Sequence, residues 1–135
     1  MNMPVPSSDS LSGKSKVIFI VEDNKDIREL FAVLLGIQGG YVVTFAACGS
    51  EALDMMRTFH PDLLLLDYHL PDMTGLQLYD LLHAQEDFQP IPTIFMSGIC
   101  PFSKREKCRL IFLQKPFRME QLRESIKQAL LLSCS

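Results

Sequence analysis

At residues 63–67 the chain reads LLLLD, a short apolar run that ends in a carboxylate. The turn-forming pairs Pro61-Asp62 and Pro71-Asp72 bound the run on both sides. An unbroken apolar run of this length is typical of a parallel strand that is buried on both faces. Open α/β sheets place their reactive groups at the carboxyl ends of such strands, which makes Asp67 the first candidate functional residue.

Four further segments have the composition of strands, and three of them end in polar side chains. They are residues 17–21, which run into Glu22-Asp23; residues 42–46; residues 94–96, which run into Ser97; and residues 110–113, which run into Lys115. Strands that alternate with helical patterns predict a parallel α/β sheet covered on both faces. Right-handed crossovers would place all the strand ends on one edge, where they gather Asp23, Asp67, Ser97 and Lys115.

The expected helices are bounded by glycines, prolines and capping residues. We expect a first helix that stops at Gly39-Gly40, a second from about Ser50, taken as its N-cap, to Phe59 before Pro61, a third from Gly75, and a last one over residues 119–132.

Composition excludes several classes of function. The 135 residues fit one domain with a net charge of −3. No basic cluster exceeds residues 104–107, so we expect no nucleic-acid surface, and no apolar run approaches the roughly 20 residues of a membrane span. Residues 1–15 are expected to be a disordered leader before a domain at 16–135 in a cytoplasmic protein. The four cysteines fit no metal spacing and are expected to be free thiols.

Three acids at neighbouring strand ends suggest a metal site. Glu22, Asp23 and Asp67 would repel one another and raise one another's pKa values, and a divalent cation would relieve that repulsion. Ligands that are all oxygen favour Mg²⁺ or Mn²⁺ over zinc. The backbone carbonyl of His69 is a candidate further ligand, because the loop turns back over the site there. The alternative is that Glu22 and Asp23 merely cap the first helix, but the acid on the adjacent strand favours the metal.

Ser97 and Lys115 could serve a phosphoryl group. On Asp67 such a group would carry a charge of about −2 and three acceptor oxygens, which a metal, the ammonium of Lys115 and the hydroxyl of Ser97 could each engage. Pro116 holds Lys115 in an extended conformation, and the bond between them can be cis. Taken singly, Ser97 could be an ordinary strand-end hydroxyl and Lys115 a surface lysine; it is the combination that favours phosphoryl binding.

Four motifs together resemble the receiver domains of two-component response regulators. They are Val21-Glu22-Asp23-Asn24, the stretch LDYHLPDMTG at 66–75, Met96-Ser97-Gly98 and Lys115-Pro116-Phe117. The resemblance covers residues 16 to about 132. It implies a flavodoxin-like, doubly wound sheet of five parallel strands in the order 2-1-3-4-5.

The resemblance also implies a role for each site residue. Asp67 would be the phosphoacceptor, and Asp23 the main metal ligand with Glu22 as its acidic companion. Ser97 and Lys115 would contact the phosphoryl group. Phe112 would occupy the position of the aromatic switch that acts with Ser97, although it also fits an ordinary core aromatic.

By the same resemblance, the chain would take a phosphoryl group from a sensor histidine kinase or a phosphotransfer protein, using Mg²⁺, and lose it by hydrolysis. It would be a signalling protein rather than a conventional enzyme. Because the chain ends just after the last helix, we expect a stand-alone receiver that signals by contact with a partner or by onward transfer. Residues 98–111 are fewer than such domains usually have, which predicts a fourth helix of at most two turns and a monomer or weak dimer.

Two alternatives remain at this point. A degenerate receiver would act as an interaction module without phosphorylation, which the shortened segment favours and the intact acid, hydroxyl and lysine set opposes. A phosphohydrolase of the haloacid dehalogenase type would need a second Asp two residues after its nucleophile. His69 stands at that position, and the chain offers no cap domain.

Overall fold

The computed structural model describes residues 15–84, 91–99 and 111–133. Their strands form one parallel sheet of five in the order β2-β1-β3-β4-β5, which confirms the expected flavodoxin-like order. The strands are β1 (Val17–Val21), β2 (Val42–Ala46), β3 (Leu63–Asp67), β4 (Thr93–Ser97) and β5 (Ile111–Gln114). The expected short fourth helix falls at 98–111, most of which lies outside the described residues.

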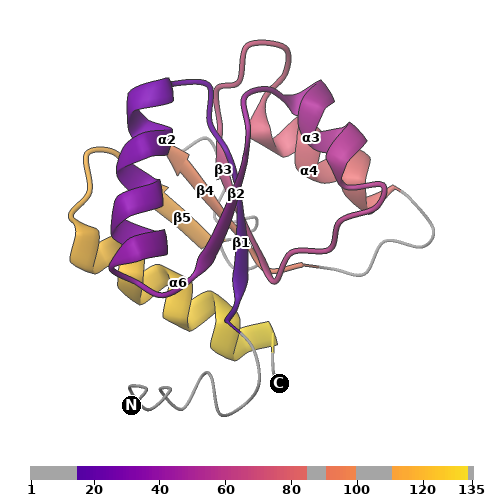
Figure 1. Ribbon diagram of the computed structural model, residues 1–135. Coiled ribbons are helices and arrows are strands. Elements are labelled where there is room, and N and C mark those ends of the chain that lie inside the picture. Colours follow the sequence, from indigo (N-terminus) through magenta and orange to yellow (C-terminus); the bar gives the residue numbers. More distant parts are fainter. Residues whose placement is uncertain (1–14, 85–90, 100–110, 134–135) are drawn as a thin grey trace.

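Helices cover both faces of the sheet (Figure 1). They are α2 (Lys25–Phe31), which continues as the π-helical segment η1 (Ala32–Ile37), then α3 (Gly49–Met55), α4 (Gly75–His83) and α6 (Met119–Ser133). The α2–η1 helix and α6 lie on one face, and α3 and α4 lie on the other.

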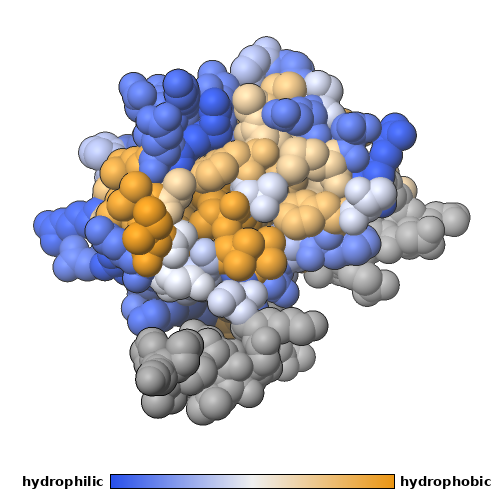
Figure 2. All heavy atoms as spheres, in the orientation of Figure 1, coloured by the Kyte–Doolittle hydropathy of each residue, from blue (hydrophilic) through white to orange (hydrophobic). Residues whose placement is uncertain are grey.

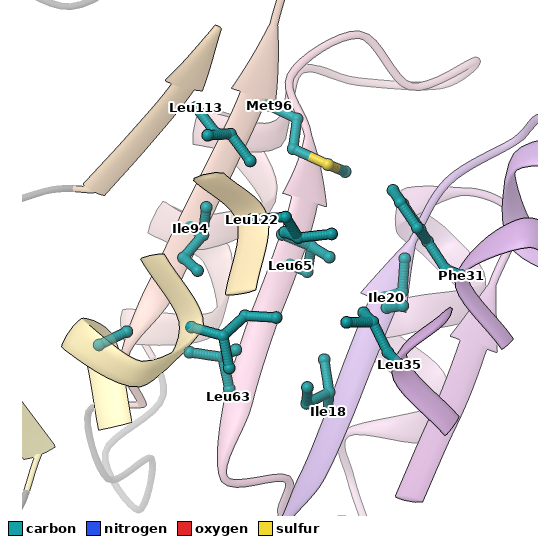
Figure 3. Packing of buried hydrophobic residues seen from close by; sticks show 12 residues of the cluster. Ile18, Ile20, Phe31, Leu35, Leu63, Leu65, Ile94, Met96, Leu113 and Leu122 are labelled. Carbon is teal, nitrogen blue, oxygen red and sulfur yellow. The ribbon is translucent and has the colours of Figure 1, made fainter. Parts of the chain in front are cut away.

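Alternation along the strands divides the core into two layers. Leu63 and Leu65 point toward α2 and α6, whereas Leu64 and Leu66 point toward α3 and α4, and all four are fully buried. Figure 3 shows the first layer, in which Ile18, Ile20, Leu63, Leu65, Ile94 and Met96 from the sheet meet Phe31, Leu35 and Leu122 from the helices. Because both faces are covered, the central strands carry unbroken apolar runs instead of alternating ones.

The first helix ends where the sequence predicts, but not as a regular α-helix. Its last six residues are π-helical, and the amide of Gln38 donates to the carbonyl of Val33. Gly40 then has a φ of 80°, a conformation that favours glycine, which confirms the predicted stop.

The expected bounds of the next helix were wrong at both ends. The helix α3 begins at Gly49 after Cys48, so Ser50 lies inside it and is not its N-cap. It ends at Met55, so Phe59 lies beyond it, although Phe59 still packs edge-on against Phe19 with ring centroids 5.4 Å apart. The sequence pattern therefore misplaced the N-cap and overestimated the length of the helix.

Candidate functional site

The carboxyl ends of the strands meet at one edge of the sheet, as expected. In the register of the sheet Val21 pairs with Leu66, Asp67 with Met96, and Ser97 with Gln114. Glu22 and Lys115 are the residues that follow β1 and β5. The fold therefore brings the predicted acids, hydroxyl and amine to the same edge.

The three predicted acids form a cluster at this edge. One carboxylate oxygen from each of Glu22, Asp23 and Asp67 lies within 4.8 Å of the others. Glu22 and Asp67 are buried, with 1% and 6% of their surfaces exposed, whereas Asp23 is exposed. The cluster thus combines two buried carboxylates with one that faces solvent.

Local hydrogen bonds fix Glu22 before the first helix. Its amide donates to the carbonyl of Ala46 on β2, and its carboxylate Oε2 accepts from the amide of Asn24 at 3.1 Å. Asn24 in turn caps α2 by accepting from the amide of Ile27, and Arg28 donates to the carbonyl of Glu22 at 2.8 Å. The residue that caps the first helix is therefore Asn24, and not Glu22 or Asp23.

The carboxylate of Asp67 is held between two donors. Its Oδ1 accepts from the amide of His69 at 3.1 Å, and its Oδ2 lies 3.4 Å from the Nζ of Lys115. Lys115 also lies 3.8 Å from Oε1 of Glu22. Lys115 is joined to Pro116 by a cis peptide bond, and its amide donates to the carbonyl of Ser97. One ammonium therefore faces two buried carboxylates.

Ser97 is 2% exposed at the end of β4, and its Oγ accepts from the amide of Ile99 at 3.3 Å. A Cβ built on Gly98 would have no atom within 4 Å among the described residues other than its chain neighbours. Phe112 is half-buried and packs against the core layer of α3 and α4. This position suits a core aromatic, and the switch role of Phe112 stays a prediction.

The electrostatics of the cluster favour a cation. Burial, and next the charge of Asp67, raise the pKa of Glu22 to about 7, against the lowering effects of the Asn24 amide and of Lys115. Oε1 of Glu22 is buried and has no hydrogen-bond partner among the described residues. The Lys115 ammonium is 3.8 Å from this oxygen, beyond hydrogen-bond distance. A buried oxygen left in this way, beside two other carboxylates, fits a hard divalent cation such as Mg²⁺. The carbonyl of His69 as a further ligand stays a prediction.

One residue of the site region was missed by the sequence reasoning. Asp72, in the loop after β3, accepts from the amides of Gly49 and Ser50 at 2.8 and 2.9 Å and so caps α3 from a distance. The sequence shows an acid after a proline, which indicates a turn, but it contains no signal that pairs residue 72 with residue 49.

A family model for the response regulator receiver domain matches residues 18–127. The chain belongs to this family. Its curated relatives include the polar-differentiation response regulator DivK of Brucella ovis, which is 33% identical over 120 residues that cover 86% of this chain and 97% of DivK. Receiver domains belong to two-component signalling proteins, so the chain is a signalling protein and not a conventional enzyme.

Solved structures agree with this assignment. The chemotaxis response regulator CheY4 of Vibrio cholerae superposes with a TM-score of 0.76 at 26% identity, over 86% of this chain and 99% of that one. The receiver domain of the sensor histidine kinase PA1611 of Pseudomonas aeruginosa PAO1 gives 0.74 at 26% identity, over 87% and 98% of the two chains, and holds a magnesium ion in its active-site cleft. Among the described residues of the present chain, no helix is both long and apolar enough to cross a membrane.

The raised pKa of Glu22 predicts a pH-dependent gain from Glu22→Gln in metal-free buffer. In the folded protein the pKa of Glu22 is raised to about 7, against 4.5 for an ordinary glutamate. The proton on Glu22 therefore favours the folded state. Its contribution to the free energy of unfolding is fully present below the pKa of Glu22 in the unfolded chain, and it is lost as pH rises through the pKa of Glu22 in the folded protein. Urea unfolding with chelator should show little difference between variant and wild type at pH 5, and a gain on the order of 2 kcal/mol for the variant at pH 8.

Glu29→Gln is the matched control, because Glu29 is exposed and pairs only weakly with Lys25 at 4.0 Å. It should show no comparable trend. A Glu22→Gln effect that is the same at pH 5 and pH 8 would contradict the assigned pKa.

Proposed function

We propose that Asp67 accepts a phosphoryl group from the phosphohistidine of a sensor histidine kinase or phosphotransfer protein. The observation that carries this proposal is the arrangement of Asp67, with Oδ2 at 3.4 Å from the Lys115 ammonium beside an acid cluster and a buried Ser97. Membership of the receiver family and the similarity to DivK support it.

The chemistry follows from positioning and charge. A carboxylate oxygen of Asp67 forms a bond to phosphorus while the bond from phosphorus to the donor imidazole breaks, and the imidazole takes up a proton from solvent. Lys115 neutralises one phosphoryl oxygen, and the Ser97 hydroxyl, which is free to rotate, donates to another. Attack by water beside Ser97 later restores the carboxylate and releases phosphate.

Glu22, Asp23 and Asp67 would hold Mg²⁺, with the carbonyl of His69 as a further ligand. When bound, the ion supplies positive charge that offsets the charge shared between the carboxylates and the phosphoryl oxygens. The magnesium ion in the PA1611 receiver domain supports this choice of metal.

An apolar groove beside Lys115 suits the donor protein. Its volume is about 510 Å³, and it is lined by Ile27, Leu30, Phe31, Leu34 and residues 115–117 and 119. Leu30, Val33 and Ile37 are exposed on the α2–η1 helix. Figure 2 shows apolar side chains gathered over the lower part of this helix and the adjoining edge of the sheet. Because Lys115 also contacts Asp67, a helix seated here would lie next to the phosphoacceptor.

Intact mass measurement tests the phosphoacceptor directly. Wild-type protein incubated with acetyl phosphate and Mg²⁺ should gain the mass of one phosphoryl group, and Asp67→Asn should gain none, because an amide cannot form the acyl phosphate. Asp62→Asn is the control, since Asp62 bonds the amide of Val17 and lies before β3 rather than after it. Full labelling of Asp67→Asn would contradict the assignment.

Calorimetric titration with Mg²⁺ tests the metal site. We expect Asp23→Asn to weaken Mg²⁺ binding by about 100-fold, because it removes a directly coordinating carboxylate from a site of few ligands. Removing one acid also relieves repulsion, so the variant should unfold at a higher temperature in chelator. Asp26→Asn, which changes the same charge within the first turn of α2, should leave the isotherm unchanged. Equal affinities for wild type and Asp23→Asn would contradict the ligand set.

Leu30→Ala tests the groove. With a phosphotransfer protein labelled on its histidine and chosen from a panel as the fastest donor, transfer should slow by about 10-fold, the usual effect of losing an interface anchor. Labelling by acetyl phosphate, which needs no docking, should not change. Leu131→Ala, on the exposed side of α6, is the control. An equal loss with both donors would mean that Leu30 acts on the site itself.

A further inference from the structure

The loop that follows the phosphoacceptor closes on its own start. The amide of Gly75 donates to the carbonyl of Tyr68, the amide of Leu70 donates to the carbonyl of Met73 at 3.1 Å, and His69 pairs with Thr74 as an antiparallel bridge. A Cβ on Gly75 would lie 2.7 Å from the carbonyl oxygen of Asp67, so the end of the loop packs directly against its beginning. Residues 68–74, here called the β3–α4 loop, therefore form a closed hairpin.

The tip of this loop is anchored to another helix. Both carboxylate oxygens of Asp72 are engaged, Oδ1 by the amide of Gly49 at 2.8 Å and Oδ2 by the amide of Ser50 at 2.9 Å. These two bonds lower the pKa of Asp72, so the carboxylate is ionised throughout the neutral range. Cys48, at the N-cap position, makes no capping hydrogen bond through its side chain within the described part of the chain.

Packing reinforces the same contact. A Cβ on Gly49 would lie 2.5 Å from the sulfur of Met73, so the absence of a side chain at Gly49 lets Met73 sit directly on the first turn of α3. Two consecutive loop residues, Asp72 and Met73, thus rest on this turn, one by hydrogen bonds and the other by close packing.

The anchored loop also holds the phosphoacceptor. The amide of His69 donates to Oδ1 of Asp67 at 3.1 Å, which leaves Oδ2 toward Lys115. His69 lies opposite Thr74, between the two backbone hydrogen bonds of the hairpin, and Thr74 is held by a capping box with Gln77 two residues after Asp72. A continuous set of bonds therefore leads from α3 to the carboxylate of Asp67.

We infer that Asp72 is a positioning residue for phosphoryl acceptance: by anchoring the β3–α4 loop to α3, it sets the orientation of the Asp67 carboxylate and of the His69 backbone. This inference rests on the proposed function of Asp67. It adds that a residue outside the acid cluster holds the Asp67 carboxylate in place. Asp72 contacts neither the metal nor the phosphoryl group and acts through His69.

Asp72→Ala is the main test, and Glu51→Ala is its matched control. Glu51 also stabilises the start of α3, by accepting from the amide of Ala47, but does not reach the loop. Each variant removes one negative charge near the start of the same helix, together with the backbone hydrogen bonds that it accepts there, two for Asp72 and one for Glu51. Thermal unfolding should therefore shift similarly in both, whereas effects on the Asp67 site should appear in Asp72→Ala alone.

Two measurements report on the site itself. Calorimetry should show Mg²⁺ binding weakened about 10-fold by Asp72→Ala, the lower end of the range for groups that support metal ligands, and unchanged by Glu51→Ala. In metal-free protein, the NMR signal of the His69 amide should move in Asp72→Ala and stay in place in Glu51→Ala. Asp72→Asn keeps an oxygen that can accept one of the two bonds, so it should recover part of the affinity.

Wild-type Mg²⁺ affinity together with an unmoved His69 signal in Asp72→Ala would overturn the inference, as would equal losses in Asp72→Ala and Glu51→Ala. If Asp72→Ala does not fold, Asp72→Asn decides by the same criteria, with a smaller loss expected. If the wild type itself binds no Mg²⁺, the proposed function fails, and the His69 signal alone then decides whether Asp72 positions the loop.

Discussion

The site depends on one ammonium group placed against two buried carboxylates. Lys115 lies 3.4 Å from Asp67 and 3.8 Å from Glu22, while Asp23 adds a third acid at the rim. A single positive charge does not balance three acids. Burial of Glu22, and next the charge of Asp67, raise the pKa of Glu22 despite the nearby ammonium. The edge therefore favours additional positive charge, and under the proposed function the same ammonium would turn to a phosphoryl oxygen.

The sheet makes this arrangement possible, because its three central strands are buried on both faces. Each of Ile18, Leu65 and Ile94 is fully buried, and truncation of any such side chain to alanine costs on the order of 2–5 kcal/mol. That packing fixes the register in which Asp67 and Ser97 end neighbouring strands. Acids placed together without such a scaffold would separate, since their repulsion favours distance.

Much of the fold and of the candidate site could be predicted from the sequence. The strand ends and the polar residues on them follow from where apolar runs stop, whereas the strand order and the role of each site residue came from the resemblance to receiver domains. The strand ends at Val21, Asp67 and Ser97 agree with the structure, and so does the start of the helix at Gly75. The bounds of α3 could not be predicted. Its cap is Asp72, 23 residues away in the chain, and local rules assign capping to nearby residues such as Ser50. The burial of Glu22 and its orphaned oxygen likewise arise from tertiary packing, which no local pattern encodes.

The central claim is that Asp67 receives the phosphoryl group within this set of residues. A crystal structure with Mg²⁺ and beryllofluoride, which mimics an acyl phosphate on a carboxylate, tests it most directly. The account predicts the beryllium bonded to Asp67, fluorines in contact with Lys115 and Ser97, and the metal on Glu22, Asp23 and Asp67. Beryllofluoride on another carboxylate, or on Asp67 with Lys115 turned away and the metal held elsewhere, would contradict it.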